Sequence, residues 1–136
     1  MIITISFTIE IPPKTKKNSM QILVNPKTKR PFIAQSSAYK AYRKAALMLI
    51  PMDVRTCIDY PVNIKYTFFT QTKRRVDELN LSAAADDILV DAGVIADDNR
   101  DIVVSHDGTR VYHDKDRPRV EVEITPVDNY EQWKSK

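Results

Sequence analysis

The sequence is poor in the residues that build disulfides and soft-metal sites. Among its 136 residues there is one cysteine, Cys57, and there are two histidines, His106 and His113. A single cysteine excludes an intrachain disulfide and a thiolate cluster for zinc. Any bound metal is therefore expected to be a hard cation held by oxygen ligands. The histidines are expected to be surface or structural residues of strands.

Long apolar runs are also missing, and none would span a membrane. Residues 1–6 lack the basic start and apolar block of a secretory signal peptide. We therefore expect a cytoplasmic protein that does not enter membranes. The length suits one hydrophobic core, and there is no internal repeat. The predicted organisation is a single domain over residues 1–127, followed by a polar tail over 128–136.

The charges are strongly segregated, although the net charge is only +3. Residues 76–99 contain seven acidic residues and no Lys or Arg, whereas the rest of the chain carries all 21 Lys and Arg residues against 11 acidic ones. A basic surface neutralises nucleic-acid phosphates, and an acidic segment repels them unless a cation sits in it. An ordinary solvated helix face explains the acidic segment equally well.

Apolar periodicity predicts an α+β class, with a mixed or antiparallel sheet and two main helices. The expected strands are 2–11, 61–70, a hairpin of 20–24 with 31–34, and an antiparallel pair of 102–113 with 118–125. The expected helices run from a cap at Ser36 or Ser37 to about Ile50, and over 78–92.

Several residues are assigned local roles within these elements. In the first helix one apolar stripe is expected to face the core, made of Tyr39, Tyr42, Ala46 and Leu49. Asp77 suits the N-cap of the second helix and Gly93 its C-terminal cap. Residues 106–108 are expected to bend or bulge the strand that contains them.

The acidic segment offers ligands for Mg²⁺. On the helix over 78–92, Asn80, Asp87 and Asp91 share one face. Asp77 starts that helix, and the pair at 97–98 follows it, so a return of the chain could bring these carboxylates together. Mg²⁺ takes such ligands with water and phosphate oxygens. In the alternative, Asp77 only caps the helix and the 86–87 pair is only solvated.

A calcium loop starting at Asp97 is excluded by its spacing. An EF-hand needs glycine at the sixth position and glutamate at the twelfth. Here these positions hold Ile102 and Gly108.

The run over 73–81 (Lys-Arg-Arg-Val-Asp-Glu-Leu-Asn-Leu), followed one helix later by Gly-Val-Ile-Ala-Asp-Asp over 93–98, resembles the RusA family of Holliday junction resolvases. These proteins are often carried by phages and prophages. The family pattern is a basic stretch, Asp-x-Asp-Asn-Leu, a lysine shortly after, and a Gly-hydrophobic-hydrophobic-x-Asp-Asp segment. The resemblance extends over roughly residues 3–125, including a first strand that ends in Pro-Pro.

Residue by residue, Asp77, Asn80 and Leu81 match the first motif, and Asp97 with Asp98 match the second. Two positions depart from the pattern: Leu79 replaces the second motif aspartate and Ala83 replaces the lysine. Both groups usually matter for catalysis in the family. Glu78 or Asp87 could restore a carboxylate. The departures leave a variant site, weakened catalysis, or a protein that binds junctions without cutting them.

The resemblance implies an endodeoxyribonuclease that resolves four-way DNA junctions in recombination and repair, with Mg²⁺ as cofactor and Mn²⁺ as a substitute. Asp77 and Asp98 are the expected metal ligands, with Asp97 and Asp87 as supporting catalytic acids. A homodimer is expected, as the family forms. DNA contacts are expected from seven residues: Lys14, Lys16, Lys17, Lys73, Arg74, Arg75 and Asn80. The rival interpretations are a noncatalytic junction- or DNA-binding protein on the same fold and a small nucleotide phosphohydrolase.

Overall fold

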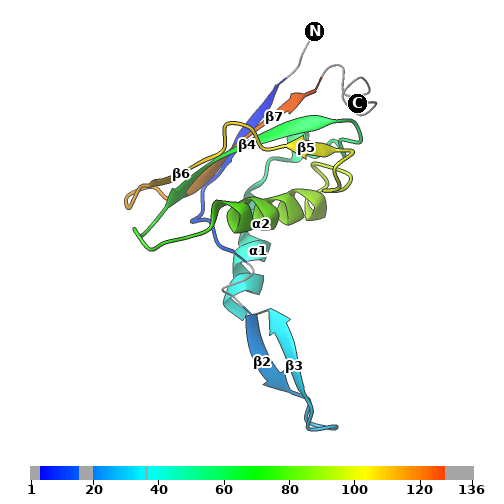
Figure 1. The fold of residues 1–136 in the computed structure, drawn as a ribbon, viewed down its shortest axis with the longest axis vertical. Coiled ribbons are helices and arrows are strands. Elements are labelled where there is room, and N and C mark those ends of the chain that lie inside the picture. Colours follow the sequence, from blue (N-terminus) through cyan, green and yellow to red (C-terminus); the bar gives the residue numbers. More distant parts are fainter. Residues whose placement is uncertain (1–3, 16–19, 36, 128–136) are drawn as a thin grey trace.

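In the computed structural model, which describes residues 4–15, 20–35 and 37–127, a mixed sheet packs against helices and a separate hairpin projects from the body (Figure 1). The sheet strands are β1 (Ile5–Ile9), β4 (Val62–Thr70), β5 (Val103–Ser105), β6 (Arg110–His113) and β7 (Arg119–Pro126). The remaining elements are β2 (Met20–Val24), β3 (Pro31–Gln35), α1 (Ser37–Leu49), the 3₁₀ turn η2 (Met52–Val54) and α2 (Glu78–Asp91). The α+β class and the two main helices are as predicted.

The long strand β4 lies at the centre of the sheet. β7 pairs antiparallel with one edge of β4, and the other edge of β7 pairs antiparallel with β1. β5 and β6 both pair in parallel with the second edge of β4. The expected antiparallel pairing of 102–113 with 118–125 is therefore wrong. The connection over 114–118 passes the end of β4 instead of closing a hairpin, so this central strand has partners on both edges. The expected bend at 106–108 is present and divides the first segment into β5 and β6.

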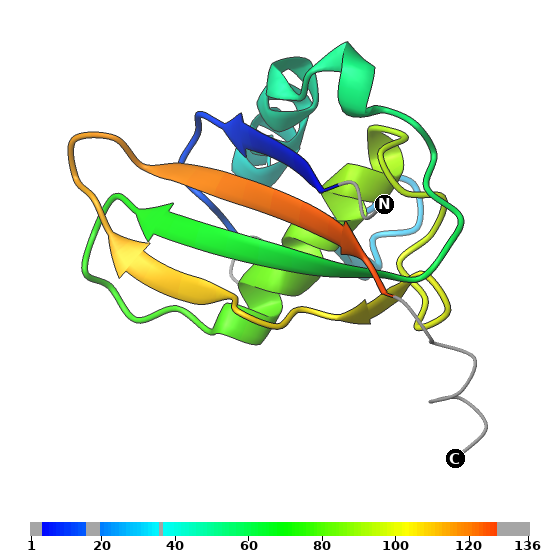
Figure 2. The same cartoon turned by 90° about the horizontal axis from the view of Figure 1, so that it is seen from above.

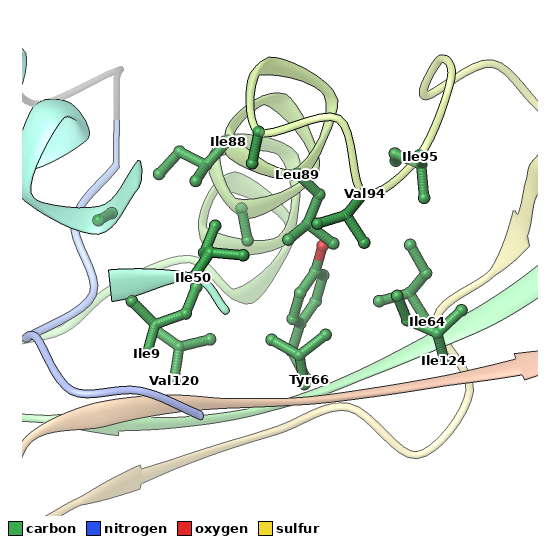
Figure 3. Close-up of a cluster of buried hydrophobic side chains, with 14 of the residues drawn as sticks. Ile9, Ile50, Ile64, Tyr66, Ile88, Leu89, Val94, Ile95, Val120 and Ile124 are labelled. Atoms are coloured by element: carbon green, nitrogen blue, oxygen red, sulfur yellow. The ribbon is translucent and has the colours of Figure 1, made fainter. Parts of the chain in front are cut away.

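The core forms between one face of the sheet and the helices, which cover that face alone (Figure 2). From Val62 to Phe68 every second residue of β4 points inward and is at most 1% exposed, which confirms the alternation predicted for this strand. Ile88 and Leu89 of α2 close over these side chains, and the hydroxyl of Tyr66 points from the sheet toward the helix (Figure 3).

Three of the four stripe residues predicted for α1 are buried, namely Tyr39, Tyr42 and Ala46. Leu49 is 44% exposed, so its assignment to the core is wrong. It is the last residue of α1, and Ile50 after it is buried in its place. Residue 36, one of the two proposed caps of this helix, lies outside the described residues.

The opposite face of the sheet is polar. A shallow hollow on it is lined by Ser6, Thr8, Lys65, Thr67, Glu121 and Glu123, with Phe7 and Val122. Lys65 and Glu123 form a long ion pair of 4.0 Å there. The alternation of β1, β4 and β7 thus separates the apolar face under the helices from a charged outer face.

The hairpin of β2 and β3 was predicted with its turn, and the register pairs Leu23 with Phe32. Its turn is held by Asn25, whose side-chain oxygen accepts hydrogen bonds from the backbone N–H groups of Lys27 and Thr28. No helix in the described part of the chain has the length and apolar character needed to cross a membrane.

Candidate active site

Helix α2 starts where Asp77 caps it. The carboxylate of Asp77 accepts a hydrogen bond of 2.9 Å from the backbone N–H of Leu79, and the Asp77 carbonyl accepts from Leu81. Such a cap satisfies backbone N–H donors that have no partner within the helix at its start. Its negative charge is also favourable at the positive N-terminal end of the helix dipole. The predicted N-cap is confirmed.

Beyond α2 the chain turns back at Gly93, whose φ of +77° is a left-handed conformation suited to glycine. The next residues, Val94 and Ile95, are buried, and Ile95 forms a parallel bridge with Ile58. The backbone N–H of Ala96 donates to the Ile58 carbonyl at 2.8 Å. This anchoring holds the following aspartates beside the helix.

The return segment brings Asp98 against Asp87 of α2. Partial burial, together with hydrogen bonds to the side chains of Asp97 and Asp87, raises the pKa of Asp98 above its ordinary value. The pKa of Asp97 is lowered, chiefly because its carboxylate accepts from the Asp98 backbone N–H at 2.7 Å and then from the Asn99 side chain at 3.2 Å. Asp98 thus lies in contact with two neighbouring carboxylates.

One acidic residue of the site points inward. Asp86 is 6% exposed, and its carboxylate accepts a hydrogen bond of 2.6 Å from the hydroxyl of Tyr66 on β4. The Nε2 atom of His106, on the turn after β5, lies 2.9 and 3.1 Å from the two oxygens of Asp86. The alternative interpretation, in which Asp86 is only solvated, is therefore wrong.

The sequence reasoning also missed the partnership of Asp86 with His106. A signal was present in the helix, because Asp86 lies three residues before Leu89 and is flanked by buried Ala85. That position faces the sheet, where an ionised side chain needs a partner. Its partners come from β4 and from the turn after β5, so the sequence of α2 alone does not reveal them.

Basic residues gather beside the start of α2. A shallow hollow of about 290 Å³ is lined by Lys14, Arg74 and Arg75, together with Pro12, Pro13 and residues 70–72 and 76. A second hollow nearby includes Lys73, Tyr112 and His113. The structure thus joins two of the predicted DNA-contact segments into one basic surface. Lys16 and Lys17, predicted for the same role, lie outside the described residues.

The other predicted residues are spread along α2. Asp77 precedes Asp87 by ten residues, which is about 15 Å of helix rise, so it stands apart from the contact of Asp87 with Asp98. Asn80 is half-buried near the start of α2. Asp91, on the predicted face of Asp87, forms an ion pair of 2.7 Å with Arg43 of α1. At the two positions that depart from the family pattern, both Leu79 and Ala83 are exposed.

Among the described residues, no group of three or more His, Cys, Asp or Glu side chains is arranged to hold a metal. Mg²⁺ does not need such a cage, since it usually binds one or two carboxylates and completes its octahedron with water and phosphate oxygens. Asp87 and Asp98 lie within hydrogen-bonding contact of each other, so their carboxylates could serve as these two ligands. A divalent cation held by both carboxylates would offset the repulsion between their charges.

Two substitutions of Asp77 separate its capping role from a catalytic one. Asparagine also caps helices, so Asp77→Asn is expected to leave the free energy of unfolding nearly unchanged, while Asp77→Ala costs about 1 kcal/mol. Urea unfolding of both variants checks this. If Asp77 binds metal, Asp77→Asn will lose DNA cleavage although it is stable; if Asp77 only caps α2, its cleavage will equal that of the unmodified protein.

Comparison with known protein families gives a match over most of the chain. The model of the RusA family, described as endodeoxyribonuclease RusA, matches residues 10–125. That span runs from the end of β1 through the basic segments, α2 and the 97–98 pair to β7. A comparison with curated proteins found no match. The chain therefore belongs to the RusA endodeoxyribonuclease family.

Proposed function

We propose that this protein is a metal-dependent endonuclease that cuts four-way DNA junctions in recombination and repair and acts in the cytoplasm. The observation that carries the proposal is the contact of Asp98 with Asp87. This contact joins the return segment to α2, and the start of the same helix lies beside a basic surface. Nuclease chemistry needs such a combination, because phosphates must be attracted and the charge of the reacting group must be neutralised.

Asp98 and Asp87 are the proposed ligands of Mg²⁺, for which Mn²⁺ is the expected substitute. A cation bound there polarises the phosphoryl group and lowers the pKa of a bound water. Asp97 accepts hydrogen bonds from the backbone N–H of Asp98 and the side chain of Asn99, and so orders the turn that presents Asp98. Asp77 is retained as a further candidate ligand, although α2 places it about 15 Å along the axis from Asp87.

The basic surface is the proposed binding site for the DNA backbone. Lys14, Arg74 and Arg75 line one hollow, and Lys73 lines the next. The segment over 73–75 leads directly into α2. A strand held there can run along α2 past Asn80 toward Asp87. Lys16 and Lys17 are proposed to extend this contact on the evidence of the sequence alone.

A homodimer is proposed as the active assembly. A four-way junction has two symmetry-related strands to cut, and a twofold dimer presents two sites related in the same way. The support for this assembly is the family to which the chain belongs.

The second candidate function is junction binding without cleavage. It is favoured by one observation: Leu79 and Ala83, which stand where the family pattern has an acid and a lysine, are exposed on α2 and bring neither charge. The basic surface would serve such a protein equally well.

The deciding experiment is incubation of a labelled synthetic four-way junction with the protein in Mg²⁺, beside linear duplex of the same sequence. We expect paired symmetric nicks in the junction and none in the duplex, with no cutting in EDTA. Tight junction binding without nicks in Mg²⁺ or Mn²⁺ would instead establish the noncatalytic function.

A further inference from the structure

The Asp86 carboxylate is the most enclosed charged group of the site. It is 6% exposed and is held by two partners, the Tyr66 hydroxyl at 2.6 Å and His106 Nε2 at 2.9 Å. Burying an ion pair costs desolvation, and replacing such a pair with apolar side chains of similar volume is often neutral or stabilising. Stability alone therefore gives little reason for a carboxylate at this position in α2.

The imidazole of His106 is held in one orientation. Its ring stacks on Tyr66, with 5.8 Å between ring centroids and 25° between ring planes, and its Nε2 faces Asp86. Among the described residues, Nδ1 forms no hydrogen bond, while the side chain is 30% exposed. A carboxylate on one ring nitrogen with the other nitrogen open is the arrangement in which histidine transfers protons to substrates.

His106 lies beside the proposed metal ligands. Burial raises the pKa of Tyr66 most, and the charges of Asp86, Asp87 and Asp98 raise it further, so all three carboxylates act electrostatically on the tyrosine whose ring stacks with that of His106. His106 is thus connected to the proposed metal ligands through Asp86 and Tyr66.

The charges that face His106 come from two elements. Asp86 and Glu78 lie on α2 and Asp107 follows in its own turn, while β4 contributes only the neutral Tyr66. The hydrogen bond with Asp86 is the largest influence, and together these acids raise the pKa of His106 above its ordinary value although burial opposes them. A ring with a raised pKa keeps its proton closer to neutral pH and can act as an acid there.

We propose that His106 is a catalytic residue whose Nδ1–H donates a proton to the oxygen that leaves the scissile phosphorus, and that Asp86 and Tyr66 are its positioning residues. The proposal rests on the nuclease function proposed above. Water attacks phosphorus and gives up a proton to solvent as the new P–O bond forms. The bond to the bridging oxygen breaks, and that oxygen takes the proton from Nδ1. The neutral imidazole regains a proton from solvent.

The first test is His106→Gln, because the glutamine amide can still donate to Asp86 but cannot act as an acid. We expect junction cleavage in Mg²⁺ to fall by about 10²- to 10⁴-fold, as is typical when a general acid is removed, with junction affinity and melting temperature close to those of the unmodified protein. Cleavage at the unmodified rate by a folded His106→Gln protein would overturn the proposal.

The second test uses a junction in which the bridging oxygen at the cut site is replaced by sulfur. A thiolate leaves without protonation, so this substrate should restore cleavage by His106→Gln to within a few-fold of the unmodified protein. Asp98→Asn is the control, and it should stay inactive on both substrates. Equal defects of His106→Gln on oxygen and sulfur substrates would mean that His106 acts structurally, and the proposal would fall.

A third measurement does not depend on cleavage. The pKa of His106, followed by NMR of the imidazole, should fall in Asp86→Asn, and the descending limb of the pH–rate profile should move to lower pH with it. An unchanged pKa would overturn the positioning role of Asp86. Absence of cutting by the unmodified protein overturns the nuclease function itself, whereas cutting that is indifferent to His106 overturns only this proposal.

Discussion

Asp98→Asn is expected to reduce junction cleavage by about 10³-fold while junction binding persists. Asparagine keeps the shape of the side chain but is a poor ligand for a divalent cation. A bound cation contributes several kcal/mol of transition-state stabilisation in phosphoryl transfer, and each 1.4 kcal/mol is a factor of about ten in rate. The substitution also removes one negative charge from the site, so affinity for DNA should stay equal or rise. Single-turnover cleavage and gel-shift titration measure the two effects separately.

The matched control for this substitution is Asp53→Asn, which changes an exposed acid in the 3₁₀ turn η2, outside the site. It should cleave like the unmodified protein. A second readout is thermal: Mn²⁺ bound at the site should raise the melting temperature of the unmodified protein, as any ligand of the native state does, and should not do so in Asp98→Asn. Normal cleavage by Asp98→Asn would exclude this carboxylate as a metal ligand and remove the main support for the proposed mechanism.

The triple substitution Lys14→Ala, Arg74→Ala, Arg75→Ala is expected to weaken junction binding in a salt-dependent way. Each cation that neutralises a phosphate contributes about 0.9 to the slope of log affinity against log salt concentration. Removing three such contacts should lower that slope by about 2.7 and should weaken binding to duplex and junction alike, since phosphate contacts carry little sequence information. All three side chains are exposed, so the free energy of unfolding should change little.

The control for the basic surface is Lys65→Ala, because Lys65 lines the hollow on the outer face of the sheet and not the hollows beside α2. Its removal should leave affinity and salt slope unchanged. An equal loss of affinity in Lys65→Ala and in Arg75→Ala would show that the chain attracts DNA by its net charge and not by the hollow beside α2.

The structure shows which charged groups lie near the two positions, 79 and 83, that depart from the family pattern. Leu79 and Ala83 bring no charge to the exposed side of α2, but Asp86 on its buried side supplies a carboxylate, and His106 supplies an imidazole from the turn after β5. If His106→Gln is impaired as proposed, the chain uses a variant of the family's site. If the unmodified protein binds without cutting, the two departures account for the loss.

Local periodicity was sufficient for most elements of the fold. Alternating apolar residues in β4, the cap at Asp77 and the turn at Gly93 are consequences of neighbouring residues alone, and the structure confirms each of them. The acidic segment could be recognised in the sequence for the same reason, because charge is a property of the sequence. So could the basic segments, which line one surface in the structure.

Strand order and burial required the tertiary structure. The sequence of 102–126 favours a hairpin, yet β5 and β6 pair with β4 because a central strand gains partners on both edges only when distant segments assemble. Asp86 and Asp87 are adjacent and chemically alike, but α2 turns one toward Tyr66 and the other toward Asp98. By itself, therefore, the sequence determined the elements, the charges and the family motif. Which carboxylate is buried, and which imidazole meets it, was decided only by packing between residues far apart in the chain.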